Sequence, residues 1–305
     1  MAVLNYAKEY SRALAQAFPY TLNFGALYAT ENNNRYRWIN AKTIEIPSIS
    51  TTGRIPGTRD SIGTAARNYD NAWESKTLSN ERKWSTLVHP MDIDQTNMVA
   101  SIANITQVFN EEQKFPEMDA YTVSKIYTDW RTTIDPVTGT TRVASTTALT
   151  VSTVLEEFDN MMLKMDNERV PANGRILYVT HEVKKLLKNA DQVTRSIDVE
   201  SGPNAIDRRV NRLDEVEIIG VPATLMKTKY NFSTGWVIAN DADQINMMLV
   251  HPTAVITPVS YTFSSLDNPS AVTNGKYYYY EESFEDVFIL NKKSGAIQFN
   301  ITEHS

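Results

Sequence analysis

The sequence predicts an α+β fold in which a long helical region and several β-rich segments occupy separate parts of the chain. Three observations support this prediction. Apolar residues recur at helical spacing over residues 94–130, short strands and helices alternate over residues 150–250, and long β-rich runs follow at 255–264 and 276–290. The composition, 42% hydrophobic and 22% charged over 305 residues, is typical of a globular chain with one elaborated domain or two.

The helical region at 94–130 is the element around which the other segments are arranged. Asp94 and Thr96 precede its first half as N-cap candidates, and Pro116 followed by Glu117 is a second helix-start signal. We therefore expect two helices in series or one long helix kinked at Pro116. The alternative is an ordinary pair of core helices, in which apolar residues recur at the same spacing. The apolar stripe of the first half consists of Met98, Ile102, Ile105 and Phe109.

The pattern of residues 1–37 predicts an extended N-terminal arm. Residues 1–20 carry Tyr6, Tyr10, Leu14 and Phe18 along one side of an amphipathic helix. The following stretch, 20–37, has few residues typical of a core, so we expect it to pack on something other than its own domain.

Residues 41–90 predict a projecting hairpin. Alternating segments at 43–46 and 81–88 indicate two strands, and about thirty residues rich in turn formers separate them. A loop of that length is uncommon in a compact domain and usually has a function. Isolated strand edges are poorly stable, so we expect a partner to order this hairpin. The alternative is a flexible surface loop.

The second half predicts a mixed layer of helices and strands. Residues 151–167 and 181–189 have helical patterns, and Thr180 is placed to cap the second of these helices. A turn is expected at 131–140, where Asp135-Pro136 and Gly139 occur. The expected strands are 175–180, 216–222, 223–226, 236–240, 245–250 and 296–301, together with the long runs named above.

Residues 96–121, TNMVASIANITQVFNEEQKFPEMDAY, resemble the corresponding segment of tailed-bacteriophage major capsid proteins, a lineage shared with encapsulins and herpesvirus capsid floor domains. The PEMDAY run is its most distinctive part, and the order of elements agrees over most of the chain. The resemblance implies the following division: an N-terminal arm (1–40), an extended hairpin loop (41–90), a peripheral domain with a spine helix (91–150), an axial domain (151–250), return strands (251–290) and a C-terminal strand (291–305).

The same resemblance implies self-assembly into hexamers and pentamers of an icosahedral shell that encloses double-stranded DNA without sequence-specific binding. Synthesis in the host cytoplasm, a final location in the virion, and portal and decoration proteins as partners follow from it. The chain starts directly with the arm, which implies a separate scaffolding protein or none. An encapsulin-like nanocompartment is the alternative. The intersubunit contact candidates are Arg54, Arg59, Arg67, Trp73 and Trp84.

The charge distribution fits an assembling chain. Residues 1–90 hold 11 Lys and Arg against 7 Asp and Glu, whereas residues 91–305 hold 19 against 29. The two parts are therefore electrostatically complementary, unless the difference arose by chance. The net charge of −6 argues against a surface devoted to nucleic acid.

No residue pattern predicts chemistry, so we expect no enzyme activity and no cofactor. Nucleotide-binding and nucleophile motifs are absent, and the chain has no cysteine. The pairs Asp92/Asp94 and Asp241/Asp243 lack the other residues of a calcium loop and are assigned to capping or turns. The chain has no run of eighteen apolar residues, so no membrane-spanning helix is predicted. None of the four histidines lies at ligand spacing from another; His89 and His251 precede proline and suggest turns.

Overall fold

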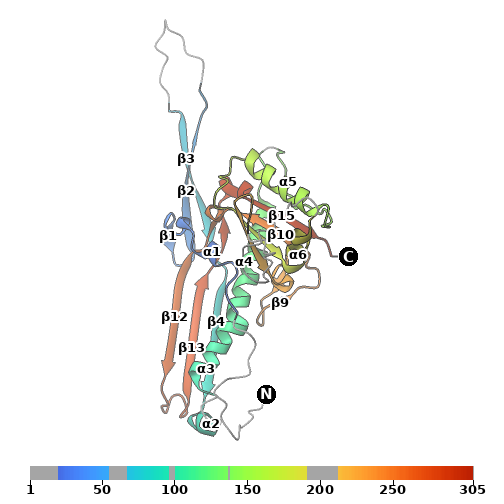
Figure 1. The fold of residues 1–305 in the computed structure, drawn as a ribbon. Helices are drawn as coiled ribbons and strands as arrows, with labels where there is room; N and C mark the ends of the chain where they lie inside the picture. The colour runs from blue at the N-terminus through green and yellow to red at the C-terminus, as the bar shows by residue number, and fades with distance from the viewer. Residues whose placement is uncertain (1–19, 55–66, 96–99, 137, 191–211, 305) are drawn as a thin grey trace, which may run out of the picture.

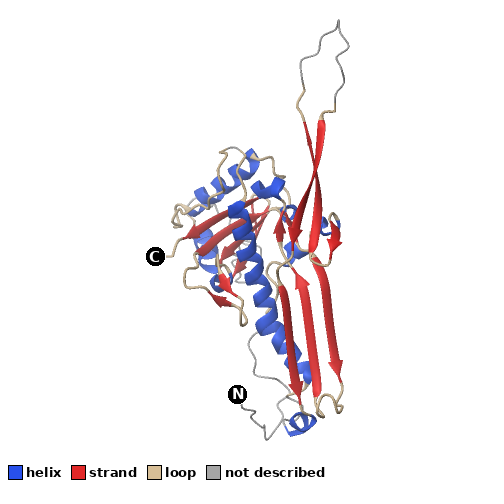
Figure 2. Ribbon diagram, turned by 180° about the vertical axis from the view of Figure 1, so that it is seen from behind, coloured by secondary structure: helices blue, strands red, loops and turns tan. Residues whose placement is uncertain are grey.

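The computed structural model describes residues 20–54, 67–95, 100–136, 138–190 and 212–304. A long helix crosses the middle of the molecule (Figure 1). One of its ends enters a body built on a five-stranded sheet, and the other runs alongside three long strands, as the view from behind shows (Figure 2). A two-stranded hairpin extends away from both (Figure 1).

The long helix, called the spine helix here, covers residues 102–132. It comprises α3 (Ile102–Phe109), a π turn (Asn110–Lys114) and α4 (Phe115–Thr132). The form with one long helix is therefore observed, and its irregular turn precedes Pro116. A proline has no amide hydrogen for the carbonyl four residues earlier, and such a position favours a local change of helical pitch.

The start of the spine helix differs from the prediction. Ser101 caps it, because its side chain accepts a hydrogen bond from the amide of Asn104 at 3.4 Å. Asp94 belongs instead to a separate short helix, α2 (Pro90–Gln95). Thr96 and Met98 lie outside the described residues.

Three antiparallel strands form the peripheral sheet beside the spine helix. They are β12 (Val259–Asp267), β13 (Tyr277–Glu285) and β4 (Glu81–Val88), in that spatial order. Residues 251–290, named above as return strands, thus supply β12 and β13, and β13 lies beside the spine helix, where Glu281 pairs with Lys114. The assignment of residues 81–88 to the hairpin was wrong, because β4 pairs with β13 over its whole length.

The hairpin is made by β2 (Thr43–Thr51) and β3 (Tyr69–Thr77), paired from Thr43 opposite Thr77 to Thr51 opposite Tyr69. A short strand, β1 (Arg37–Asn40), adds to the other edge of β2. The hairpin is thus narrower in sequence than the predicted 41–90. It still projects from the rest of the molecule, as expected (Figure 1).

The axial body contains the five-stranded sheet, in which only β5 and β7 are parallel. Thr180 caps α6 by accepting from the amide of Val183, as predicted. Residues 223–226 were expected as a strand but contain a 3-10 turn. The sheet order is β15 (Ile297–Thr302), β10 (Gln244–Val250), β5 (Ile176–Thr180), β7 (Val216–Val221) and β6 (Arg212–Leu213), with helices α5 (Val154–Asn167) and α6 (His181–Asn189).

The short elements connect these parts. They are α1 (Gly25–Tyr28), β8 (Tyr230–Asn231), β9 (Val237–Ile238), β11 (Val255–Ile256) and β14 (Phe288–Ile289), with 3-10 turns at Glu31–Asn34, Ala223–Leu225, Pro252–Ala254 and Asn291–Ala296.

Residues 20–36 pack on the chain's own core, so the expectation that this stretch contacts only something else was wrong. Phe24 and Leu27 are fully buried in the main hydrophobic cluster, which includes Trp130. The buried carboxylate of Asp119 accepts hydrogen bonds from the backbone amides of Asn23 at 2.8 Å and Phe24 at 3.3 Å. The predicted helix at 1–20 lies outside the described residues up to position 19.

Candidate intersubunit surfaces

One face of the hairpin is apolar and exposed. Strand register places Tyr69, Ile49 and Trp73 on the same face, because Thr51 pairs with Tyr69, Ile49 with Asn71 and Pro47 with Trp73. Their exposed fractions are 58%, 67% and 46%. A contiguous exposed apolar surface commonly marks a site of protein association. This hairpin face is therefore a candidate contact surface.

Arg37 holds Trp73 in a defined orientation on that face. Its guanidinium lies 4.2 Å from the centre of the Trp73 ring. The same guanidinium donates to one carboxylate oxygen of Glu45 from Nη2 at 2.9 Å and from Nε at 3.2 Å. These contacts favour one orientation of the Trp73 ring, and a side chain oriented before a partner binds loses less entropy on binding.

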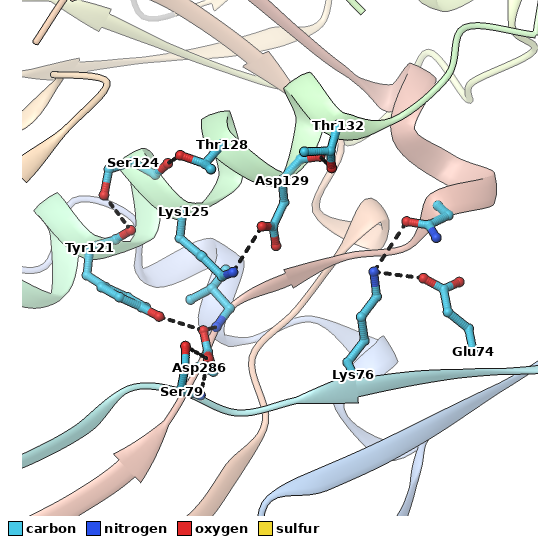
Figure 3. A network of polar contacts seen from close by, with 12 residues as sticks. Glu74, Lys76, Ser79, Tyr121, Ser124, Lys125, Thr128, Asp129, Thr132 and Asp286 are labelled. Carbon is cyan, nitrogen blue, oxygen red and sulfur yellow. Dashed lines mark hydrogen bonds and ion pairs between the residues drawn. The ribbon is translucent and has the colours of Figure 1, made fainter. Parts of the chain in front are cut away.

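The base of the hairpin is joined to the spine helix through one buried carboxylate (Figure 3). Asp286 is 1% exposed and accepts hydrogen bonds from the Ser79 amide at 2.8 Å and the Tyr121 hydroxyl at 2.7 Å. It also accepts from the Ser79 hydroxyl and the Val287 amide. Burial, and then the charge of Asp286, raises the pKa of Tyr121, so its hydroxyl stays protonated and donates.

A second joint lies further along the hairpin. Lys76 Nζ is 2.8 Å from a carboxylate oxygen of Glu74 and 3.3 Å from the amide oxygen of Asn291 (Figure 3). Lys292 Nζ donates to the carbonyl of Ile49 at 2.9 Å. Together with the base, these contacts fix the direction in which the hairpin projects.

The helix side of the same network carries another ion pair. Lys125 and Asp129 lie one turn apart on the spine helix, 2.9 Å from each other (Figure 3). Burial raises the pKa of Asp129, and Lys125 opposes that rise by a hydrogen bond and by its charge. This pair presents a polar helix surface toward the hairpin base.

The peripheral sheet has a second apolar surface, on its face away from the spine helix. The rings of Tyr261, Phe263, Tyr280 and Tyr278 form a row with successive centroids 6.2, 6.3 and 6.4 Å apart. Tyr261 and Phe263 are 48% and 44% exposed, and Leu87 on the same face is 56% exposed. We call this row the aromatic face.

The predicted contact residues fall in three places. Arg54 and Arg67 are exposed on the hairpin, and Arg67 contacts the carbonyl of Tyr69 at 3.2 Å. Trp73 lies on the apolar hairpin face. Trp84 is instead on β4, where it stacks on Phe109 of the spine helix with centroids 3.9 Å apart. Arg59 lies outside the described residues.

The sequence prediction missed Ile49 and Tyr69, which join Trp73 on the hairpin face. The sequence does contain a signal for this face: Tyr69 and Trp73 are four residues apart, so they lie on one face of a strand, and Ile49 lies on the other strand of the hairpin. The prediction did not use it because it paired residues 43–46 with 81–88.

Two histidines serve backbone turns, as their position before proline suggested. His89 Nδ1 accepts from the amide of Met91 at 3.1 Å, and His251 Nδ1 accepts from the amide of Thr253 at 3.3 Å. Burial lowers the pKa of His251. Within the described ranges, no three His, Asp or Glu residues gather as a metal-ligand group. No helix in that part of the chain has the length and apolarity to cross a membrane.

Comparison with known proteins gives matches among solved structures. No protein-family model matches the chain, and no curated protein matches it. A chain from the capsid structure of cyanophage P-SCSP1u is 13% identical, with 98% of this chain and 93% of that chain covered and a TM-score of 0.70.

Two further structures show the same likeness. A chain from the mature capsid of bacteriophage PhiM1 is 13% identical, with 98% and 92% of the two chains covered and a TM-score of 0.67. A structure from Mycobacterium phage Che8 is 13% identical, with 98% of both chains covered and a TM-score of 0.64.

The protein therefore has the α+β fold of phage capsid chains over nearly its whole length. At this level of identity, the fold is the property that the matches share. Nothing in them favours the encapsulin alternative.

Proposed function

We propose that this chain is a tailed-phage major capsid protein, which self-assembles into the icosahedral shell enclosing the phage double-stranded DNA. The observation that carries the proposal is the hairpin, which projects from a capsid fold and presents an exposed apolar face. A large apolar side chain gains about 1.5–3 kcal/mol when it moves from full exposure to full burial, and Trp73, 46% exposed, has roughly half of that still to gain. The projecting hairpin therefore needs a partner surface, and a second copy supplies it.

The hairpin of each subunit lies on the neighbouring subunit in hexamers and pentamers. Its apolar face, with Ile49 between Tyr69 and Trp73, meets the aromatic face of the neighbour's peripheral sheet. Arg54, Arg59 and Arg67 supply positive charge around this contact. Trp84 lies on the other side of the peripheral sheet, stacked on Phe109, and is outside this contact. Each contact is weak alone, but closure repeats it around the shell and leaves no free surface.

The acidic balance suits the enclosed DNA. A chain with net charge −6 surrounds nucleic acid without binding it tightly, because phosphate binding depends on clusters of Lys and Arg. The protein acts without catalysis or cofactor. It is made in the host cytoplasm and resides in the virion, where portal and decoration proteins, and a separate scaffolding protein if one is used, are its partners.

Expression of the chain followed by size-exclusion chromatography and electron microscopy tests the proposal. We expect capsomers and megadalton shells. An enzyme of mixed α/β type would elute as a small oligomer at every concentration. A compact monomer that stays monomeric at high concentration and in the presence of assembly-promoting salt would exclude the capsid function.

A further inference from the structure

A pocket at the hairpin base combines an apolar floor with a basic rim. Its cavity is about 220 Å³, and it lies where the segment after α1, strand β2 and the 290–293 loop meet. We call its apolar lining the floor and its polar lining the rim. The floor consists of Tyr36, Ile46, Pro47, Ile256 and Leu290, and the rim consists of Asn32, Arg35 and Lys293.

The two cations at the rim have little negative charge of their own chain to pair with. Lys293 Nζ donates to the carbonyl of Thr253 at 3.0 Å, and within the described residues it forms no ion pair. Arg35 reaches one carboxylate, that of Glu31 at 3.9 Å, and both side chains are mostly exposed. Burial, and then the charge of Arg35, lowers the pKa of Lys293. The pocket is therefore suited to an apolar side chain accompanied by a carboxylate.

Helix α2 presents that combination at the far end of the peripheral sheet. Met91 is 58% exposed, and Asp94, three residues later, is also exposed. Residues three apart lie on neighbouring positions of a helix surface, so the thioether and the carboxylate face the same side. Methionine is flexible and polarisable, which suits it to fill an irregular apolar pocket. The Asp94 carboxylate has no ion-pair partner within the described ranges.

The two surfaces belong to opposite ends of one subunit. Figure 1 shows α2 at the tip of the peripheral sheet, whereas the pocket lies near α1 and β1, at the other end of the long strands. A straight strand of nine residues spans about 30 Å at 3.3 Å per residue. The α2 of one copy therefore reaches this pocket only on another copy.

We propose that α2 of one subunit docks into the hairpin-base pocket of a second subunit, with Met91 on the apolar floor and Asp94 beside Arg35 and Lys293. This inference rests on the proposed function, because it describes a contact inside an assembly of identical chains. It differs from the hairpin contact because helix α2 is the occupant and a pocket receives it, although Pro47 borders both the pocket and the apolar hairpin face. It also explains why a short acidic helix with an exposed methionine ends the peripheral domain.

A charge exchange tests this contact. The variants R35E and D94K are each assembled and compared with the wild type by sedimentation and electron microscopy. We expect each single variant to yield about tenfold fewer shells, because a weakened contact is repeated at every subunit. The double variant R35E/D94K restores the opposite charges and should recover most of the wild-type yield. K185E is the matched control, since Lys185 is exposed on α6, away from both surfaces.

The outcomes separate this contact from the capsid function itself. Shells of the wild type establish assembly independently of the variants. Undiminished assembly of both single variants would overturn the α2 contact and leave the capsid function intact. A double variant as impaired as the single ones would also overturn it, because Arg35 and Asp94 would then interact with other groups and not with each other. Thermal unfolding of the unassembled subunits checks that each variant folds.

Discussion

The hairpin and the axial sheet are both made of paired strands, yet they are stabilised in different ways. In the axial sheet, every residue of β5 is buried, and so are five of the seven residues of β10. In the hairpin, Ile44 is the only fully buried residue of β2 and β3. The strands are paired along their length in both regions, whereas the burial of apolar surface differs between them.

This difference shows where each region obtains its stability. The axial sheet obtains it from apolar burial within one subunit. A two-stranded hairpin alone is marginally stable in water. The present one is fixed at its base by Asp286 and Lys76, and under the proposed function a second copy covers its outer part.

Removing the outer hairpin should produce the largest effect. We expect a variant in which residues 48–72 are replaced by Asn-Gly to keep a folded axial body but to form no shells, because Ile49, Tyr69 and the projecting part of the hairpin are removed and Trp73 alone remains of its apolar face. Circular dichroism with thermal unfolding measures the first property, and electron microscopy measures the second. Normal shells from this variant would mean that the hairpin is a passive loop. Loss of the cooperative unfolding transition would mean that the two regions are not independent.

Breaking the joint at the hairpin base should have the next largest effect. D286A leaves the Ser79 amide and the Tyr121 hydroxyl buried without their acceptor, which we expect to lower the free energy of unfolding by about 3 kcal/mol. Chemical denaturation measures this value, and limited proteolysis should cut the hairpin faster. D267N is the control, because Asp267 is exposed on β12. Equal stability of the two variants would show that the joint does not hold the hairpin.

The sequence was most informative where signals are local. The spine helix, the cap at Thr180 and the β-rich runs at 255–264 and 276–290 follow from spacing and capping residues within a few positions. These features depend on residues that are close together in the sequence, so the sequence alone is enough to predict them.

Features that depend on distant pairing were not predictable in this way. Strand 81–88 has the same alternation whether it pairs with β2 or with β13, since a strand's pattern does not name its partner. The burial of Phe24 and Leu27 depends on Asp119, almost a hundred residues later, which accepts the backbone amides around them. The face formed by Tyr69, Ile49 and Trp73 required the correct register.

Removing one anchor from the hairpin face should have a smaller effect on assembly than removing the hairpin. We expect W73A to raise the subunit concentration needed for shell formation by roughly three- to tenfold, because burial of the exposed half of the Trp73 ring contributes about 0.7–1.5 kcal/mol. Light scattering against concentration measures this threshold. W38A is the matched control, since Trp38 pairs with Ile44 and lies on the opposite face of the same sheet. If W73A and W38A raise the threshold concentration equally, the effect comes from a general loss of hairpin stability and not from the loss of the Trp73 contact.

The smallest effect concerns the groove between the spine helix and the peripheral sheet, where Glu285 lies. Burial raises the pKa of Glu285, and the charge of Lys114 opposes this rise. The folded state therefore binds a proton more readily than the unfolded state, so the contribution of this group to stability falls as pH rises from its ordinary pKa through the raised one. E285Q removes the charge, and we expect it to stabilise unassembled subunits at pH 7 by roughly 1 kcal/mol or less.

That gain should disappear below pH 4, where the wild-type carboxyl is also neutral. Thermal unfolding between pH 3 and 8 measures the difference, with E303Q as the control at an exposed glutamate. A gain that is equal at every pH would show that the substitution acts by packing and that the buried charge is not its cause. Because the groove lies within one subunit, the same gain should appear in the variant without the outer hairpin. If E285Q gives no gain in that variant, the stability of the spine helix depends on the hairpin. The distinction between a region stabilised internally and one stabilised by its neighbour would then be weaker.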